Sequence, residues 1–483
     1  MRAALFATIA LVIAAPAAAH DAEPAVVTQH EITVDGRPLR YTAEAGRLAI
    51  RDAETGEPRG WMFYTAYRAS SETPRPLTFV WNGGPGAAST LLHFEVAGPK
   101  RIEGDRLVDN ADTWLTATDL VFVDPIGTGF SRPAKAEYAD AFYGTVGDVA
   151  SVTEFVRAWR RLHGAEDAPL YLAGESWGAG RAANVGAALL KRGVRVDGLA
   201  LISGGAGLRD EWSRPGDVTA LRIAHLAATA AFHGKGTSRD PATAQAAAEA
   251  WVRKTYIPAL GRLASLSDAQ RDAIARELAH HTGLPPSAID RKTLTVTPRQ
   301  FRTTLAPGKT LDTFDMRISA RDSGAEPRAP VLLRYFIRDL GYRTDMPYVG
   351  LERLEDAYLP TGKAPQSVGA RWNYATAEVT PQERERAYAE AVRTGAGPPQ
   401  LGPPLPGTAE AVALNPKLRV LVASGLHDSL ANCPGAAETA RNLPAPLKAS
   451  MRFKCYVGGH MMYRDADTRA EFSRDVRALV SGQ

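Results

Sequence analysis

A serine lies between two glycines in the segment GESWG, which covers residues 174–178. The segment follows a short apolar run at residues 170–173 and precedes an alanine-rich stretch, so we expect it to join a strand to a helix. A sharp turn here would strain Ser176 and lift its hydroxyl to the carboxyl end of the strand. Glycine is needed on both sides because side chains would collide with neighbouring elements. Ser176 is therefore the candidate nucleophile, and an ordinary turn between a strand and a helix is the alternative.

A serine hydroxyl is a weak nucleophile at neutral pH and needs a general base, which an acid in turn orients. In hydrolases with this turn, the acid and then the base follow the serine along the chain. Asp428 and His460 fit this order, and each comes just after an apolar run. His427 competes with His460 for the role of base because it is next to Asp428. The two glycines that precede His460 favour His460.

The segment NGGPG at residues 82–86 follows another apolar run and is a candidate anion-binding loop. Consecutive glycines let backbone N–H groups approach a ligand closely. In this type of hydrolase, one N–H group of the oxyanion hole follows the nucleophile and the other comes from such a loop. These positions are Trp177 and Gly84. A tight turn without a binding role is the alternative.

We expect no metal and no cofactor. The chain has no H-E-x-x-H or C-x-x-C motif, and GTG at residues 127–129 lacks the third glycine of a dinucleotide site. The neighbouring His280 and His281 are expected on different faces of a helix, with both rings in solvent. The histidines other than His427 and His460 show no metal-ligand spacing, and they occupy positions 20, 30, 93, 163, 225, 233, 280 and 281.

The elements that position these residues alternate between strand and helix. Residues 30–67 have the alternating pattern of a few antiparallel strands. Short apolar runs then alternate with amphipathic helical stretches, which requires crossover connections and a largely parallel sheet. The predicted strands cover residues 77–81, 120–123, 170–173, 196–203, 418–423 and 451–457. Helices are predicted at residues 148–163 and 466–480, and another helix follows the strand at 170–173 and ends at residue 191.

Helix signals dominate between the fourth and fifth of these parallel strands, for about two hundred residues. Ser267 with Gln270 forms a candidate capping box, and Thr297 before Pro298 is a second helix start. We therefore predict an α/β-hydrolase fold, with a mostly parallel central sheet and flanking helices, interrupted by a helical cap. The predicted parts are a signal peptide at 1–19, a first core part at 20–207, the cap at 208–410 and a second core part at 411–483.

The first residues, MRAALFATIALVIAAPAAA, have the pattern of a signal peptide. Arg2 precedes an apolar run at residues 3–15, and small residues precede position 20. A membrane anchor is the alternative, but the run is shorter than the roughly 20 residues of a spanning helix. We predict cleavage near Ala19, export to the periplasm or the medium, and no stable membrane insertion.

The amino-acid composition is that of an ordinary globular protein and excludes several other classes. The 483 residues are 45% hydrophobic and 23% charged, which argues against a disordered, collagen-like or coiled-coil chain. The net charge is +4, and no run of Lys or Arg is long enough to form a nucleic-acid patch. Two cysteines cannot make a disulfide scaffold, so hydrophobic burial must hold the core together. The oligomeric state is not indicated.

Several motifs resemble the serine carboxypeptidase family (peptidase family S10), in particular its bacterial exported members. These motifs, in the family's order, are WNGGPGAAS (81–89), FEVAGP (94–99), VDPIGTGFS (123–131), GESWGAG (174–180), and GLHDSLANC (425–433) with GGHMMY (458–463). The resemblance implies a serine-type carboxypeptidase that hydrolyses C-terminal peptide bonds through an acyl-enzyme. An esterase or acyltransferase on the same scaffold is the alternative, and a binding protein without activity is a remote one.

The resemblance implies the same triad, Ser176, Asp428 and His460, and the same oxyanion donors, Gly84 and Trp177. It adds that Asn82, Glu95 and Glu175 bind the free C-terminal carboxylate of a peptide substrate. A glutamate can donate a hydrogen bond to a carboxylate only when it is protonated. Two buried carboxyls close together cannot both ionise cheaply, so the pair would hold a proton at acidic pH. The KM for peptides should then rise with pH.

The two cysteines flank the candidate acid and base. Cys433 lies five residues after Asp428, and Cys455 lies five residues before His460. If the two loops are neighbours, a disulfide between these cysteines would tie them together, and export would allow it. Two buried thiols are the alternative.

Overall fold

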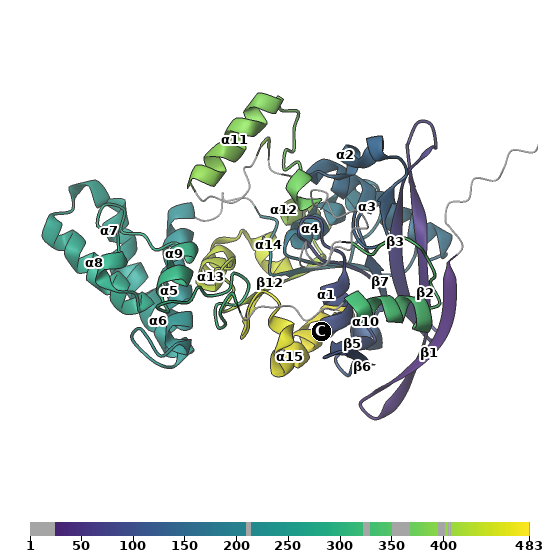
Figure 1. Ribbon diagram of the computed structural model, residues 1–483, viewed down its shortest axis with the longest axis horizontal. Helices are drawn as coiled ribbons and strands as arrows, with labels where there is room; N and C mark the ends of the chain where they lie inside the picture. Colours follow the sequence, from purple (N-terminus) through teal and green to yellow (C-terminus); the bar gives the residue numbers. More distant parts are fainter. Residues whose placement is uncertain are drawn as a thin grey trace, which may run out of the picture.

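The computed structural model describes residues 25–208, 214–321, 329–349, 368–394, 401–403, 405 and 407–482. The predicted signal peptide, at residues 1–19, lies outside the described residues. Figure 1 shows a central sheet with helices packed along it and a separate helical lobe at one end, which is teal. None of the helices in the described part of the chain has the length and apolar character needed to cross a bilayer.

The main sheet runs in the order β1-β2-β3-β7-β4-β9-β10-β11-β12, and β8 pairs with β3. Strands β1, β2 and β3 pair antiparallel, whereas all pairs from β7 to β12 are parallel. This order confirms the predicted α/β-hydrolase fold. The bounds are β1 (Val26–Val34), β2 (Arg37–Arg51), β3 (Pro58–Ala69), β4 (Leu77–Trp81), β7 (Asp119–Val123), β8 (Arg132–Pro133), β9 (Leu170–Glu175), β10 (Gly198–Ile202), β11 (Arg419–Gly425) and β12 (Met451–Tyr456).

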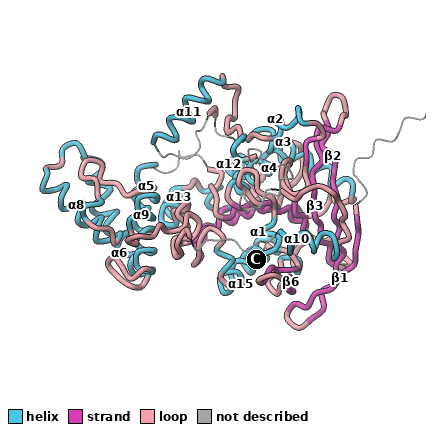
Figure 2. The backbone as a smooth tube through the Cα atoms, viewed as in Figure 1, coloured by secondary structure: helices cyan, strands magenta, loops and turns pink. Residues whose placement is uncertain are grey.

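Hydrophobic cores cover both faces of the sheet. Figure 2 shows helices on both sides of the strands. Along β4, Phe79 and Trp81 pack into one core and Val80 into the other, because successive side chains of a strand point to opposite faces. Helices α3 (Thr145–Leu162), α4 (Trp177–Lys191) and α12 (Gly407–Leu414) contribute to the first core, and α15 (Ala466–Ser481) contributes to the second.

The segment between β10 and β11 forms helices and divides into two parts. Helices α5 to α9 build their own core around residues such as Leu226, Leu278 and Phe301. By contrast, Tyr335 and Phe336, which follow α10, pack into the second sheet core. The bounds are α5 (Pro215–Phe232), α6 (Pro241–Trp251), α7 (Ile257–Gly261), α8 (Asp268–Thr282), α9 (Pro298–Thr304), α10 (Ala329–Arg334) and α11 (Pro381–Thr394). The expected cap boundary at residue 410 falls inside α12.

Two details of the lobe test local predictions. The capping box of Ser267 and Gln270 at the start of α8 is confirmed, and Thr297 caps α9 with Pro298 in its first turn. The expectation that both neighbouring histidines lie in solvent is wrong for His281, which is 6% exposed. Its ring packs against Trp251, at 5.0 Å between centroids, because that face of α8 is turned toward the lobe core.

Candidate active site

Ser176 forms the sharp turn between β9 and α4, with φ 57° and ψ −125°. A non-glycine residue in this region of backbone space is strained, and such strain concentrates at functional sites. The Ser176 N–H donates to the carbonyl of Ile202 at 2.8 Å, which ties the turn to β10. A Cβ on Gly174 would collide with the carbonyl of Gly178, and a Cβ on Gly178 would lie 2.7 Å from the carbonyl oxygen of Asn82. Both glycines are therefore required for the turn.

Asp428 and His460 follow the neighbouring parallel strands β11 and β12, and the structure brings them together. Asp428 Oδ2 lies 2.7 Å from His460 Nδ1, and Asp428 Oδ1 accepts the N–H of Leu430 at 2.9 Å. Since a carboxylate only accepts, the proton of the imidazole is on Nδ1. His460 Nε2 is buried and has no hydrogen-bond partner in the described part of the chain, so the structure does not bond it to Ser176.

The environment of His460 makes it a stronger base than an ordinary histidine. Burial lowers its pKa, but the charge and hydrogen bond of Asp428 raise it more, and Glu175 adds to this. Arg464 opposes them, and the net pKa lies above the ordinary value. The competing His427 is placed differently, because its Nδ1 lies 3.0 Å from the hydroxyl of Thr229. Burial lowers the pKa of His427 to about 3, which makes it a poor base.

The NGGPG loop lies directly on the turn that carries Ser176. Trp81 Nε1 donates to the carbonyl of Gly178 at 2.9 Å, and Arg181 donates to the carbonyl of Asn82 at 2.8 Å. A Cβ on Gly83 would lie 2.5 Å from the backbone nitrogen of Trp177, so this close approach requires glycine. Within the described residues, the backbone N–H groups of Gly84 and Trp177 have no protein acceptor. Two such donors beside a nucleophile have the character of an oxyanion hole.

The three residues expected to bind a carboxylate are buried, and two of them are hydrogen-bonded to each other. Asn82 Nδ2 donates to Glu175 Oε2 at 3.0 Å, and the hydroxyl of Tyr463 donates to the same oxygen. Glu95 instead makes a bidentate ion pair with Arg464, whose Nε and Nη2 lie 2.9 and 3.2 Å from its oxygens. The structure therefore adds a cation to a group that we expected to contain only neutral and acidic side chains.

Residues 38–195 match the family model described as serine carboxypeptidase, and these residues include the NGGPG loop and Ser176. This part of the chain, about a third of its length, is similar to the serine carboxypeptidase family. It is 37% identical over 144 residues to the pheromone-processing carboxypeptidase KEX1 of Yarrowia lipolytica, covering 28% of this chain and 22% of that protein. It is 33% identical over 180 residues to serine carboxypeptidase-like 50 of Arabidopsis thaliana, covering 35% of this chain and 38% of that protein.

The chain spans about a quarter of the length of the pheromone-processing carboxypeptidases that it matches. Among solved structures it is similar to a thermostable carboxyl esterase from Bacillus coagulans in complex with glycerol. That similarity has a TM-score of 0.38 and 13% identity, and it covers 91% of this chain and 98% of the esterase.

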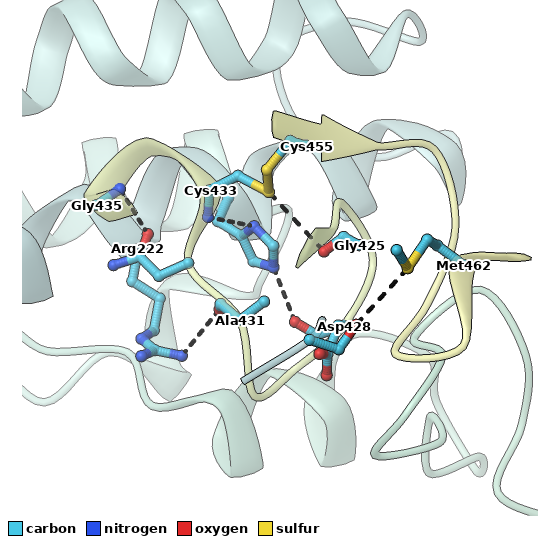
Figure 3. Close-up of a disulfide and its surroundings, with 11 residues drawn as sticks. Arg222, Gly425, Asp428, Ala431, Cys433, Gly435, Cys455 and Met462 are labelled. Carbon is cyan, nitrogen blue, oxygen red and sulfur yellow. Dashed lines mark hydrogen bonds between the residues drawn. A yellow bond between two sulfur atoms is a disulfide. The ribbon is translucent and has the colours of Figure 1, made fainter. Parts of the chain in front are cut away.

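A disulfide joins Cys433 to Cys455, with 6.0 Å between the Cα atoms. Figure 3 shows the bond beside the loop that carries Asp428. Cys433 ends this loop and begins α13 (Cys433–Asn442), whereas Cys455 lies in β12, the strand before His460. The disulfide thus links the strand that precedes the base to the loop that carries the acid.

Three side chains that contact the candidate site residues were not predicted from the sequence, namely Arg464, Tyr463 and His225. A signal for Arg464 was present, because a cation four residues after His460 falls next to the GGHMMY motif. The same motif contains Tyr463. His225 was set aside with the histidines that lack metal-ligand spacing, although it donates to the backbone of Asp428. Its signal was a polar stripe on an otherwise apolar helix.

Proposed function

We propose that the protein is a serine-type carboxypeptidase that hydrolyses the last peptide bond of its substrates. The observation that carries this is the strained Ser176 at the strand-to-helix turn, on the same sheet edge as the bonded Asp428–His460 pair. Ser176 would attack the carbonyl carbon while His460 Nε2 takes its proton. The N–H groups of Gly84 and Trp177 would stabilise the negative oxygen of the tetrahedral intermediate.

The second half of the reaction uses the same groups in reverse. His460 would return the proton to the leaving amine, so that the C–N bond breaks and an acyl-enzyme remains on Ser176. Water, deprotonated by His460, then attacks the ester and releases the shortened peptide. An esterase or acyltransferase would follow the same steps, with an ester as substrate or an alcohol in place of water. The match of residues 38–195 to the serine carboxypeptidase family favours the peptide substrate.

Mass spectrometry of a defined peptide pool after incubation with the enzyme tests this function. We expect stepwise loss of C-terminal residues from peptides with a free C-terminus and a much slower release of the terminal residue from peptides with a C-terminal amide. Turnover of esters with intact peptides would support the alternative activity. No turnover, together with no labelling of Ser176 by a fluorophosphonate, would identify a binding protein and refute both activities.

We propose that Asn82, Glu95 and Glu175 receive the substrate's terminal carboxylate, with Arg464 as an additional part of the site. Three carboxyl groups would then meet, and the guanidinium of Arg464 is the positive charge that offsets their repulsion. Ionisation of the glutamates at higher pH makes this repulsion larger, so the KM for peptides is expected to rise with pH. Arg464 should weaken this rise.

Arg464→Gln is therefore expected to raise the KM for peptides with a free C-terminus by about 10-fold or more, with the largest effect at high pH. The KM for the matching C-terminal amide should change little, because the amide carries no charge. Arg452→Gln is the matched control, since Arg452 pairs with Asp475 on the outside of β12. Equal effects on the acid and the amide, or a KM that is constant from acidic to neutral pH, would contradict this site.

We also propose that residues 208–410 form the part that shapes the pocket and that the mature chain is exported after cleavage near Ala19. The disulfide of Cys433 and Cys455 supports export, because such bonds persist in oxidising compartments. The intact mass of protein recovered outside the cytoplasm tests the cleavage. Retention of residues 1–19 in that protein would contradict it.

A further inference from the structure

Helix α5 carries a stripe of polar side chains on an otherwise apolar surface. Arg222, His225 and Thr229 recur at spacings of three and four, which places them on one face of the helix. His225 and Thr229 are completely buried. Buried polar groups cost free energy unless they are hydrogen-bonded, so this face needs polar partners. Its partners lie in the loop that carries the candidate catalytic acid, residues 427–432, which we call the acid loop.

Each member of the stripe bonds to the acid loop. Arg222 Nη1 lies 3.3 Å from the carbonyl oxygens of both Ser429 and Ala431, as Figure 3 shows for Ala431. Thr229 Oγ1 lies 3.0 Å from Nδ1 of His427. From the loop side, Asn432 Nδ2 donates to the carbonyl of Val218 on the same helix at 2.6 Å. The insertion thus holds the acid loop through its backbone carbonyls and through the side chains of His427 and Asn432.

His225 makes the contact nearest to the chemistry. Its Nε2 lies 2.9 Å from the backbone carbonyl oxygen of Asp428, and the N–H of Cys433 donates to its Nδ1 at 3.4 Å. A carbonyl accepts and an N–H donates, so His225 must be neutral with its proton on Nε2. Burial lowers its pKa to about 4, Asp428 raises it and Arg222 lowers it, which keeps the ring in this state at neutral pH.

We propose that His225 is a positioning residue that fixes the backbone of Asp428 so that its carboxylate meets His460. The ring bridges Asp428 to the end of the acid loop, and the Cys433–Cys455 disulfide holds that end against β12. Loss of the ring would remove the hydrogen bond to the buried N–H of Cys433 and would leave the carbonyl of Asp428 with the longer bond from the N–H of Ala431, at 3.2 Å. The loop would then relax, and the contact between Asp428 and His460 would lengthen. The inference rests on the catalytic role proposed above for this pair.

Four variants test the role of His225 with a p-nitrophenyl ester as substrate. His225→Phe keeps the ring volume and removes both hydrogen bonds, so kcat should fall by about 10- to 100-fold with little change in KM. His225→Gln places an amide N–H where Nε2 was and should stay within a few-fold of the wild-type kcat, whereas the shorter His225→Asn should not. Leu226→Ala is the control, because Leu226 packs in the lobe core and its truncation should weaken the packing of α5 without removing a contact to the acid loop.

The pH profile separates positioning from loss of stability. The acidic limb of kcat/KM reports the pKa of His460, which Asp428 and Glu175 raise and Arg464 lowers. If Asp428 moves away, this pKa falls, and the limb should shift to lower pH by about one unit in His225→Phe and His225→Asn. Leu226→Ala and His225→Gln should keep the wild-type limb.

Three outcomes would overturn the inference. The first is a folded His225→Phe variant with wild-type kcat and pH limb, and the second is a Leu226→Ala variant with the same losses and the same shift. If His225→Phe does not fold, equal activity of His225→Gln and His225→Asn is the third. Failure of the proposed function looks different, because the wild-type enzyme would then fail to label with a fluorophosphonate. A wild-type enzyme that turns over only esters leaves this test valid.

Discussion

Ser176→Ala is expected to lower kcat on the order of 10⁶-fold, for esters as well as for peptides. The change removes the oxygen that forms the acyl-enzyme and leaves the turn, the oxyanion donors and the Asp428–His460 pair in place. Alanine has the same Cβ as serine, so the backbone at φ 57° is no more strained than before and the fold should persist. A small residual rate would come from substrate binding and the oxyanion hole.

Steady-state kinetics with one ester and one peptide, and labelling by a fluorophosphonate, measure this effect. Ser265→Ala is the matched control, because Ser265 is exposed in the lobe and bonds only to its own turn. Thermal unfolding shows whether the variant keeps its fold. A Ser176→Ala enzyme that still reacts with the label, or that retains a tenth of the wild-type kcat, would show that another group is the nucleophile.

The sequence predicted the positions of reactive side chains best where these side chains come directly after a strand. Ser176, Asp428 and His460 each come just after a short apolar run, and the carboxyl ends of parallel strands meet at one edge of a sheet. Strand type and chain order were therefore enough to place these residues near one another. The requirement for glycines around Ser176 could also be predicted, because it comes from the geometry of the turn itself.

The contacts that were missed join residues that are far apart in the chain. His225 bonds to Asp428 across 203 positions, and Arg464 pairs with Glu95 across 369. Apolar periodicity predicts that α5 is a helix, but it does not say which element its polar face meets. The same limit explains the error at His281, since its burial depends on how α8 packs against the rest of the lobe.

The cap was predicted as one helical unit, whereas the structure shows two parts that pack differently. Helices α5 to α9 have a core of their own, but Tyr335 and Phe336 fill the space over the sheet beside Phe94. A change in the insertion can therefore disturb the core of the sheet as well as the pocket that we propose it shapes. The polar face of α5 extends this connection to the acid loop, so part of the support for the candidate acid lies outside the central sheet.

Asp428→Asn is expected to lower kcat by about 10⁴-fold while leaving the fold intact. The reason lies in the two oxygens of this carboxylate. Oδ1 accepts the N–H of Leu430, so the asparagine carbonyl stays there and its NH₂ group faces His460 Nδ1. That nitrogen must then accept, which moves the imidazole proton to Nε2. Nε2 is the atom that should take the proton of Ser176, and in this tautomer it cannot.

The pH profile gives this prediction a second readout. The charge and hydrogen bond of Asp428 raise the pKa of His460, so the variant's acidic limb of kcat/KM should move to lower pH, even as the rate at neutral pH falls. Asp197→Asn is the matched control, because Asp197 is also buried and accepts a backbone N–H, from Leu170. It lies at the amino end of the strands, away from Ser176. A decrease in kcat of less than about 10-fold in Asp428→Asn, or an equal decrease in the control, would mean that Asp428 does not orient the base. Replacing an acid that fixes the tautomer should lower kcat much more than this.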